Sequence, residues 1–371
     1  MELPRRLALF VLACLAWRAA AAAPLYDARV IDADISGGLT LPGGGTLLLW
    51  GNHATILYSV DGVNWSQAET HGNADLAGIA SKADGRVSIA VGAHGVVLRS
   101  TDGGRSWQAA RNTEDADLDT VSFHAPSGAW IAAGAGGRIQ RSTDGGKHWK
   151  SLPSTLTSAL HTSFVDPKTQ RLLIGGDDGV VGVSADGGAS WDVTKISMPD
   201  PVTPVTGFHR FGDRLLATSA MGRFLMSNDD GYHWELLQAE SKGPWTDAAF
   251  DQAHGVVVLV GHNGDVLRSM DQGQNWEPGA IDLDGRRSHL SAVHFDAKSR
   301  SLLAVGEDTL ARSTDGGAHW ERAWGKVRED YRGLVAAGEL WVAFGDAGLV
   351  VTSTDAGLHW SRARVVRRSP Q

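Results

Sequence analysis

The sequence predicts an all-β chain folded as a β-propeller of four-stranded blades, with eight blades as the simplest count. A short pattern, Ser-x-Asp-x-Gly-x-x-Trp or a near copy of it, occurs eight times in the 371 residues, about once every 42 residues. Each unit also shows short apolar segments separated by turns that contain Gly or Pro. No unit shows an apolar period of 3.6 residues long enough for a helix.

One unit, residues 118–153, illustrates the prediction. Residues 119–124, 129–133 and 138–142 are typical of three short strands, and Trp149 opens a fourth. Turn-forming residues separate the four segments. Four short antiparallel strands in about 42 residues make one propeller blade.

We expect the repeated pattern to be structural. Its aspartate can accept hydrogen bonds from the backbone of its own turn. Its tryptophan can bury roughly 150–250 Å² against the hairpin and the adjoining blade. Calcium takes about six to eight oxygens, so one carboxylate per turn does not predict a metal site. The structural residues are Asp61, Asp102, Asp144, Asp186, Asp229, Asp271, Asp315 and Asp355, with Trp65, Trp107, Trp149, Trp191, Trp234, Trp276, Trp320 and Trp360.

The blade count has one alternative. The first pattern, which ends at Trp65, is shortened, and residues 26–31 leave room for an accessory segment beside a seven-bladed ring. Residues 361–366 are just long enough for the outer strand of the last blade. Closure by an N-terminal strand is therefore allowed but not required.

The first 22 residues resemble a signal peptide, which leaves residues 23–371 as a single propeller domain. Arg5 and Arg6 precede an apolar run too short to span a bilayer, and small residues around Ala22 suit cleavage after it. We therefore expect an exported protein. In the alternative, Cys14 ends a loose lipoprotein cleavage box and carries a lipid anchor.

The charge balance argues against nucleic acid as a partner. The formal net charge is -8, and the Lys and Arg residues are scattered along the chain. Binding to the phosphate backbone needs a basic surface.

Two runs, residues 99–107 and 141–149, carry a family resemblance. Together with Gly95 and Gly137 they match Gly-x-x-x-Arg-Ser-x-Asp-Gly-Gly-x-x-Trp. This pattern resembles the Asp-box, or BNR, repeat, and in its fuller form the photosystem II assembly and stability factor propellers, over residues 33–366. The Asp box alone is shared with sialidases, xyloglucanases and sortilin-type receptors, so it indicates the fold more than the function.

The resemblance implies a non-enzymatic scaffold that holds a membrane subunit through arginines on one face. Four arginines occupy one position, just before the box serine, and Val183, Met226 and Thr352 interrupt the series. Such arginines are either partner contacts or side chains whose stems cover a strand edge. With three arginines from blade-joining loops, the candidate partner-binding residues are Arg99, Arg141, Arg268, Arg312, Arg286, Arg287 and Arg332.

We therefore expect a scaffold, peripheral to a membrane at most, for a membrane protein or envelope complex subunit. It would work in the periplasm, or in the thylakoid lumen of a photosynthetic organism. Steering toward an acidic segment of the partner is expected from the arginines. Neither a catalytic residue, a metal nor a cofactor is predicted, since no close His/Cys spacing supports a metal site.

Two alternatives remain. One is a periplasmic carbohydrate-binding or sialidase-like hydrolysing propeller, and the other is a structural subunit with no transient client. The Arg-Ile-Pro start of sialidases is absent, Arg29-Val30-Ile31 being the nearest string. Tyr58 and Tyr232 belong to box regions, which leaves Tyr26 and Tyr331 as candidate nucleophiles.

Overall fold

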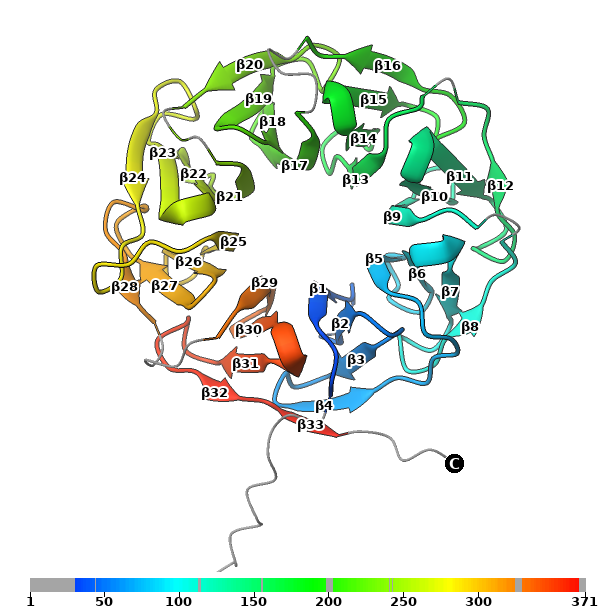
Figure 1. The fold of residues 1–371 in the computed structure, drawn as a ribbon, viewed down its shortest axis with the longest axis horizontal. Helices are drawn as coiled ribbons and strands as arrows, with labels where there is room; N and C mark the ends of the chain where they lie inside the picture. Colours follow the sequence, from blue (N-terminus) through cyan, green and yellow to red (C-terminus); the bar gives the residue numbers. More distant parts are fainter. Residues whose placement is uncertain are drawn as a thin grey trace, which may run out of the picture.

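The computed structural model describes residues 31–43, 45–112, 115–154, 156–197, 203–239, 241, 243–323 and 329–366. The predicted signal peptide and Cys14 lie outside these residues. Eight antiparallel sheets form a ring, with strands β1, β5, β9, β13, β17, β21, β25 and β29 around its centre (Figure 1). The prediction of an eight-bladed propeller is confirmed.

Each blade runs from its inner strand outward in chain order. The strands of blades 1 to 4 are β1 (Ile35–Thr40), β2 (Leu47–Gly51), β3 (Ile56–Ser59), β4 (Asn64–Gln67); β5 (Leu76–Ser81), β6 (Ser88–Gly92), β7 (Val97–Ser100), β8 (Gln108–Ala109); β9 (Leu118–His124), β10 (Ala129–Gly134), β11 (Arg138–Ser142), β12 (Lys150–Ser151); β13 (Leu160–Val165), β14 (Leu172–Gly176), β15 (Val180–Ser184) and β16 (Asp192–Lys195).

Blades 5 to 8 repeat the arrangement. Their strands are β17 (Val205–Phe211), β18 (Arg214–Ser219), β19 (Arg223–Ser227), β20 (Glu235–Gln238); β21 (Trp245–Asp251), β22 (Val256–Gly261), β23 (Asp265–Ser269), β24 (Glu277–Ala280); β25 (Leu290–Asp296), β26 (Ser301–Gly306), β27 (Thr309–Ser313), β28 (Glu321–Arg322); β29 (Tyr331–Ala337), β30 (Leu340–Gly345), β31 (Val350–Ser353) and β32 (Ser361–Arg362). Short 3-10 turns join second to third strands as η1 (Ala93–Gly95), η2 (Ala135–Gly137), η3 (Asp177–Gly179), η4 (His262–Gly264) and η5 (Asp346–Gly348).

The C-terminal strand closes the ring. After β32 the chain continues into β33 (Arg364–Val366), which pairs in parallel with β4 of blade 1. Val365 lies opposite Trp65 in this pairing, and Trp65 is fully buried. No accessory unit is needed, because the first shortened box forms a complete blade.

Alternating turns give the ring two distinct faces. The box turns and the turns between first and second strands lie on one side, which we call the box face. The second-to-third strand turns and the segments that join blades lie on the other, which we call the loop face.

Apolar side chains from neighbouring blades share each core. Trp107 of blade 2 packs with Leu48 and Ile56 of blade 1. Trp149 of blade 3 packs with Ile89 and Val91 of blade 2 in the same way. The box tryptophans thus bury their rings against the preceding blade, as expected of large aromatic side chains in a core.

Seven of the eight second strands end in a glycine, at a close approach of backbone, while β18 ends at Ser219. At Gly134 a Cβ atom would lie 2.2 Å from the carbonyl oxygen of Asp117, which begins the inner strand region of the same blade. A side chain at Gly134 would collide with this carbonyl oxygen and push the segment that joins blades 2 and 3 away from the sheet.

Candidate functional site

The box turns are held by their own aspartates. In blade 4 the Oδ1 atom of Asp186 accepts hydrogen bonds from the backbone N–H groups of Ala189 and Ser190, each at 2.9 Å. The Ser184 hydroxyl donates to the same carboxylate at 2.8 Å and accepts from the Gly188 N–H at 2.8 Å. The expectation that these aspartates bind their own turn is confirmed.

Hydrogen bonding keeps the box carboxylates ionised. Backbone and side-chain hydrogen bonds from Asn275 lower the pKa of Asp271 to about 2. In Asp355 the backbone N–H of His359 is the largest cause of a pKa lowered to about 2, although partial burial opposes it. The oxygens of these carboxylates already accept hydrogen bonds within the turn, so they are poorly suited to act as general bases or as metal ligands.

Three of the four arginines before the box serine tie one blade to the next. The Arg99 Nε atom donates to the carbonyl oxygen of Gly145 at 2.8 Å, and Arg141 donates to Gly187 at the same distance. Arg312 donates to the carbonyl of Ala356 at 3.2 Å. Each acceptor lies in the box turn of the following blade, and each arginine is half-buried.

Arg268 differs from these three. Its guanidinium pairs with Glu277 of its own blade, with Nη2 2.7 Å from Oε2. The neighbouring box turn is instead approached by Met270, whose sulfur would lie 3.6 Å from a Cβ at Gly316. The arginine before the box serine therefore bonds to the next blade in three units and pairs within its own blade in the fourth.

The other three candidate arginines lie on the loop face, each beside an aspartate. Arg287 Nη2 is 3.1 Å from Asp265 Oδ1. Arg332 Nε is 2.6 Å from Asp346 Oδ1, and Arg286 Nη1 is 3.8 Å from Asp308 Oδ2. The structure therefore divides the seven predicted arginines between the two faces.

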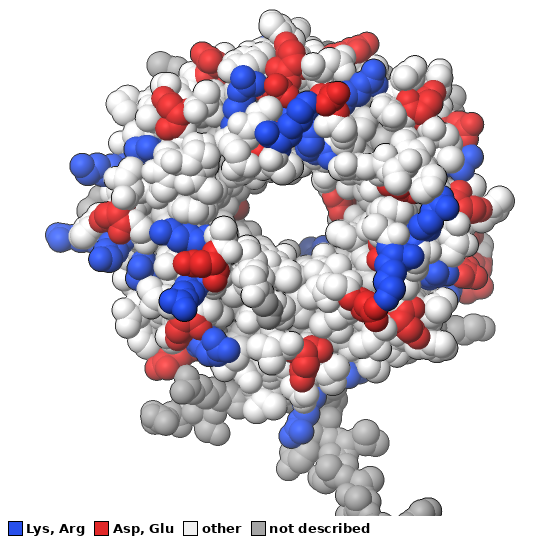
Figure 2. Space-filling model, turned by 180° about the vertical axis from the view of Figure 1, so that it is seen from behind, with Lys and Arg blue, Asp and Glu red and all other residues white. Residues whose placement is uncertain are grey.

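Basic and acidic side chains alternate around the ring, and the central channel is open (Figure 2). No single basic block is visible on the face that Figure 2 shows.

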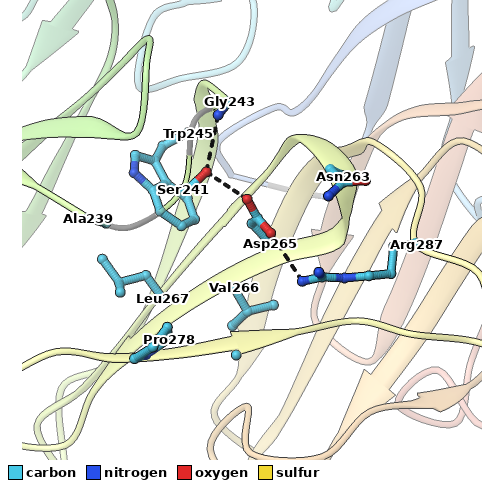
Figure 3. Close-up of a pocket in the computed structure, with 11 residues that line it drawn as sticks. Ala239, Ser241, Gly243, Trp245, Asn263, Asp265, Val266, Leu267, Pro278 and Arg287 are labelled. Carbon is cyan, nitrogen blue, oxygen red and sulfur yellow. Dashed lines mark hydrogen bonds and ion pairs between the residues drawn. The ribbon is translucent and has the colours of Figure 1, made fainter.

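A cleft of about 430 Å³ opens at the loop-face end of blade 6. Its rim carries Ser241 from the joint before blade 6, Asn263 from η4, and Arg287 from the joint after blade 6 (Figure 3). Its apolar walls come from β23 and β24 and from Trp245. The further apolar lining residues are Ala239, Val266, Leu267 and Pro278.

Asp265 organises the cleft. The Ser241 hydroxyl donates to Asp265 Oδ2 at 2.6 Å, while Arg287 approaches Oδ1 from the other side (Figure 3). The Gly243 N–H donates to Ser241 Oγ at 3.2 Å, which fixes the serine. The Asp265 carboxylate is therefore held from both sides, by Ser241 and by Arg287. The size falls within the range of ligand pockets.

Two histidines lie beside this rim. The ring centroids of His262 and His289 are 4.3 Å apart, and the Asn263 N–H donates to His289 Nδ1 at 3.0 Å. Burial, and then the nearby His289, lower the pKa of His262, so His262 favours its neutral form. Because His289 Nδ1 accepts a backbone N–H, its proton sits on Nε2.

Sequence reasoning missed Ser241 and Asp265 as members of one site. Neither residue belongs to a repeated pattern. The segments before and after blade 6 meet at the same cleft only because the chain folds into a ring. The signal available was positional: Asp265 is an acidic residue at the start of a third strand, where most units carry another residue type.

A ring of β-bulges around the channel was also missed. In every blade the pairing of the first and second strands skips the second residue of the inner strand region. Bulges re-aim side chains. The skipped residues are Ser36, Ala77, Asp119, His161, Thr206, Thr246, Ser291 and Arg332.

Several bulge residues reach the adjoining blade. Ser36 Oγ donates to the carbonyl of Leu76 at 3.3 Å, and Thr246 Oγ1 donates to the carbonyl of Leu290 at 2.8 Å. Both acceptors begin the next inner strand. The bulges therefore link blades at the loop-face mouth of the channel.

Within the described ranges, no three His, Cys, Asp or Glu side chains are arranged to hold a metal ion. Tyr331, one candidate nucleophile, is buried, and burial followed by the charge of Asp308 raises its pKa. A phenol held neutral in this way is a weak nucleophile. The part of the chain that the structure describes also contains no helix long and apolar enough to span a bilayer.

Part of the chain is similar in sequence to a family of assembly factors. Residues 226–328 match the family described as "Photosynthesis system II assembly factor YCF48". This segment includes the residues of the cleft from Ala239 to Arg287. No curated protein sequence matches the chain significantly.

Solved structures share the fold. "YCF48 bound to D1 peptide" is 17% identical, with a TM-score of 0.57, covering 86% of this chain and 93% of that one. YCF48 from Cyanidioschyzon merolae is 21% identical, with a TM-score of 0.55, covering 75% and 94%. The GH74 xyloglucanase from Xanthomonas campestris is 14% identical, with a TM-score of 0.56, covering 89% and 67%.

At these identities the solved structures establish the fold alone, while the family match adds the sequence pattern of the repeat. The chain is therefore an eight-bladed Asp-box, or BNR, β-propeller that resembles the photosystem II assembly factor YCF48.

Proposed function

We propose that this propeller is a non-catalytic scaffold that binds an extended segment of a membrane protein subunit at the loop-face cleft of blade 6. The cleft is the observation that carries the proposal. Its apolar walls suit a partner side chain, while Ser241, Asn263 and Arg287 offer polar groups at the rim. Ligand sites commonly combine an apolar lining with a few placed polar groups.

Two comparisons support a protein partner. The family match covers the cleft, and one solved relative of the same fold is described as bound to a D1 peptide. In this chain, binding would be tuned by Arg286, whose side chain is 57% exposed and only loosely paired with Asp308. A carboxylate of the partner can compete for that guanidinium.

The seven predicted arginines then contribute differently. Arg286, Arg287 and Arg332 lie on the proposed binding face. The other four arginines make hydrogen bonds or ion pairs within the propeller, and binding of a partner through them stays a prediction.

Affinity capture from detergent-solubilised membranes tests the proposal. The wild-type protein is expected to retain a membrane subunit, and Arg286→Glu combined with Arg287→Gln should weaken that retention several-fold. Lys150→Glu is the matched control, because Lys150 is exposed on β12, away from the cleft. Equal retention by all three proteins would place the binding surface elsewhere.

The carbohydrate alternative has its own test. Purified protein is applied to a glycan panel and assayed for release of reducing sugar. Turnover that one Asp or Glu substitution abolishes would replace the scaffold proposal with a hydrolase.

We also propose export through residues 1–22, with work in the periplasm or, in a photosynthetic organism, the thylakoid lumen. Cell fractionation and the mass of the mature N-terminus test this. A start at residue 23 supports it, a lipid-modified Cys14 favours the anchored alternative, and a retained leader would contradict it.

A further inference from the structure

A cluster of titratable groups lies between blades 3 and 4 at the loop-face mouth of the channel, away from the cleft. His161, the bulge residue of β13, lies between Asp119 of β9 and Asp177 of η3. Its Nδ1 is 3.1 Å from Asp119 Oδ2, and its Nε2 is 2.9 Å from Asp177 Oδ1. The side chain is 34% exposed, so the contacts are shielded in part.

This geometry requires a charged imidazole. A carboxylate can only accept, so each ring nitrogen must carry a proton to donate to its partner. A neutral imidazole has one N–H, and its other nitrogen would direct a lone pair at a carboxylate. Loss of one ring proton therefore breaks one of the two hydrogen bonds, and the bare ring nitrogen then repels the carboxylate that it faces.

The charged groups around His161 are few. Asp119 faces it from β9 and Asp177 from η3, and these two are the charges that act on it among the described residues. The adjacent Asp178 is engaged elsewhere, since Ser158 donates to it at 2.7 Å and Lys195 Nζ lies 3.6 Å away. The geometry therefore places the imidazole of His161 between two carboxyl groups, one from each blade.

The joint between blades 3 and 4 lacks a hydrogen bond that three other joints have. At three other joints a carboxylate before the inner strand caps a turn of the preceding blade, as Asp117 does by accepting the His94 N–H at 2.7 Å. Asp75 and Asp34 act in the same way at 3.0 and 2.9 Å. The corresponding residue between blades 3 and 4 is Ala159, which has no such group.

Deeper contacts limit how far the joint can open. Ser163 Oγ lies 2.6 Å from Thr120 Oγ1 and 2.7 Å from Ser122 Oγ, further along the same pair of inner strands. These hydroxyl contacts do not titrate. Release of His161 would therefore loosen the loop-face end of the joint and leave the blades attached below it.

We propose that His161 is a proton-operated clamp that holds the loop-face rim between blades 3 and 4 closed when charged and releases it when neutral. Burial opposes the charge, but the hydrogen bonds and charges of Asp177 and Asp119 outweigh it and raise the pKa of His161. The stability contribution is complete below the unfolded pKa of roughly 6.5 and is lost as pH rises through the folded value. The clamp stands apart from the proposed scaffold function.

Thermal unfolding of the full chain between pH 5.5 and 9 tests the clamp. His161→Gln, which cannot titrate, should have a lower Tm than wild type at pH 5.5, and the gap should narrow toward pH 9. His71→Gln is the control, because His71 is exposed in the joint between blades 1 and 2. Its profile should follow wild type throughout. Parallel profiles for wild type and His161→Gln would overturn the proposal.

Nitrogen NMR of ¹⁵N-histidine-labelled wild-type protein gives a second measurement that needs no stable His161 variant. Protons on both ring nitrogens of His161 at pH 6 are expected. Asp119→Asn removes one of the two carboxylates, so its His161 signal should titrate at lower pH and thereby identify the resonance. A His161 ring that is already neutral at pH 6 would refute the clamp.

Discussion

The Nε atom of Arg99 in blade 2 lies 2.8 Å from the carbonyl oxygen of Gly145 in the box turn of blade 3. Arg141 repeats the relationship between blades 3 and 4. The same residue that gives the repeat its fuller pattern thus holds neighbouring blades together. A charge reversal at either arginine would therefore break a contact between blades, so a change in partner binding could not be separated from a loss of stability of the ring.

Removal of one inter-blade arginine contact should destabilise the protein measurably. Arg141→Met keeps most of the apolar stem and loses the bond to Gly187, so we expect a loss of about 1.5–3 kcal/mol in the free energy of unfolding, as for hydrogen bonds to charged groups. Urea unfolding followed by tryptophan fluorescence measures it.

Arg268→Met is the matched control for that variant. Arg268 bonds to exposed Glu277 of its own blade, so its loss should cost less than about 1 kcal/mol. Equal losses for Arg268 and Arg141 would show that the inter-blade contact adds nothing.

A box carboxylate should matter more than an exposed one on the same blade. Asp186→Ala leaves two backbone N–H groups and two hydroxyls without their acceptor, and we expect a loss of roughly 2–3 kcal/mol. Asp192→Ala, on exposed β16, should change stability by less than about 0.5 kcal/mol. Hydrogen exchange of blade 4 localises the effect, and uniform exchange in both variants would argue against it.

Acid should unfold the propeller through the box carboxylates. Hydrogen bonds hold the pKa of Asp61, Asp271 and Asp355 at about 2, below the unfolded value of roughly 3.9. Their contribution is present above the unfolded pKa and is lost as pH falls through the folded one. Circular dichroism should show loss of β-structure between about pH 4 and 2. A fold unchanged at pH 1.5 would contradict this.

Deletion of β33 should weaken ring closure. A chain that ends at residue 363 loses the pairing of residues 364–366 with β4 and uncovers part of the core around Trp65. We expect a Tm several degrees lower and faster exchange in blade 1. A chain that ends at residue 366 is the control and should match the full chain. A Tm that the longer deletion does not lower would show that β33 is dispensable.

The sequence predicted the repeated parts of the molecule well, because each box satisfies its own hydrogen bonds locally. The hydrogen bonds that hold the turn of Asp186 join residues at most four positions apart.

Contacts between blades were harder to predict. The acceptor for Arg99 lies 46 residues away, so no local pattern shows whether the guanidinium reaches a neighbour or solvent. The His161 bulge depends on strand register, and the cleft around Asp265 depends on the order of blades around the ring. Both depend on how the blades are arranged in the closed ring, and the sequence of a single unit does not specify that arrangement.

Closure by β33 has a consequence for when the molecule can be completed. Because β33 follows all eight blades in sequence, β4 of the first blade gains its outer neighbour only after blades 2 to 8 have been synthesised. Until then the emerging chain remains an open arc of blades with an unfinished edge. The ring therefore closes through β33 only once all eight blades are present.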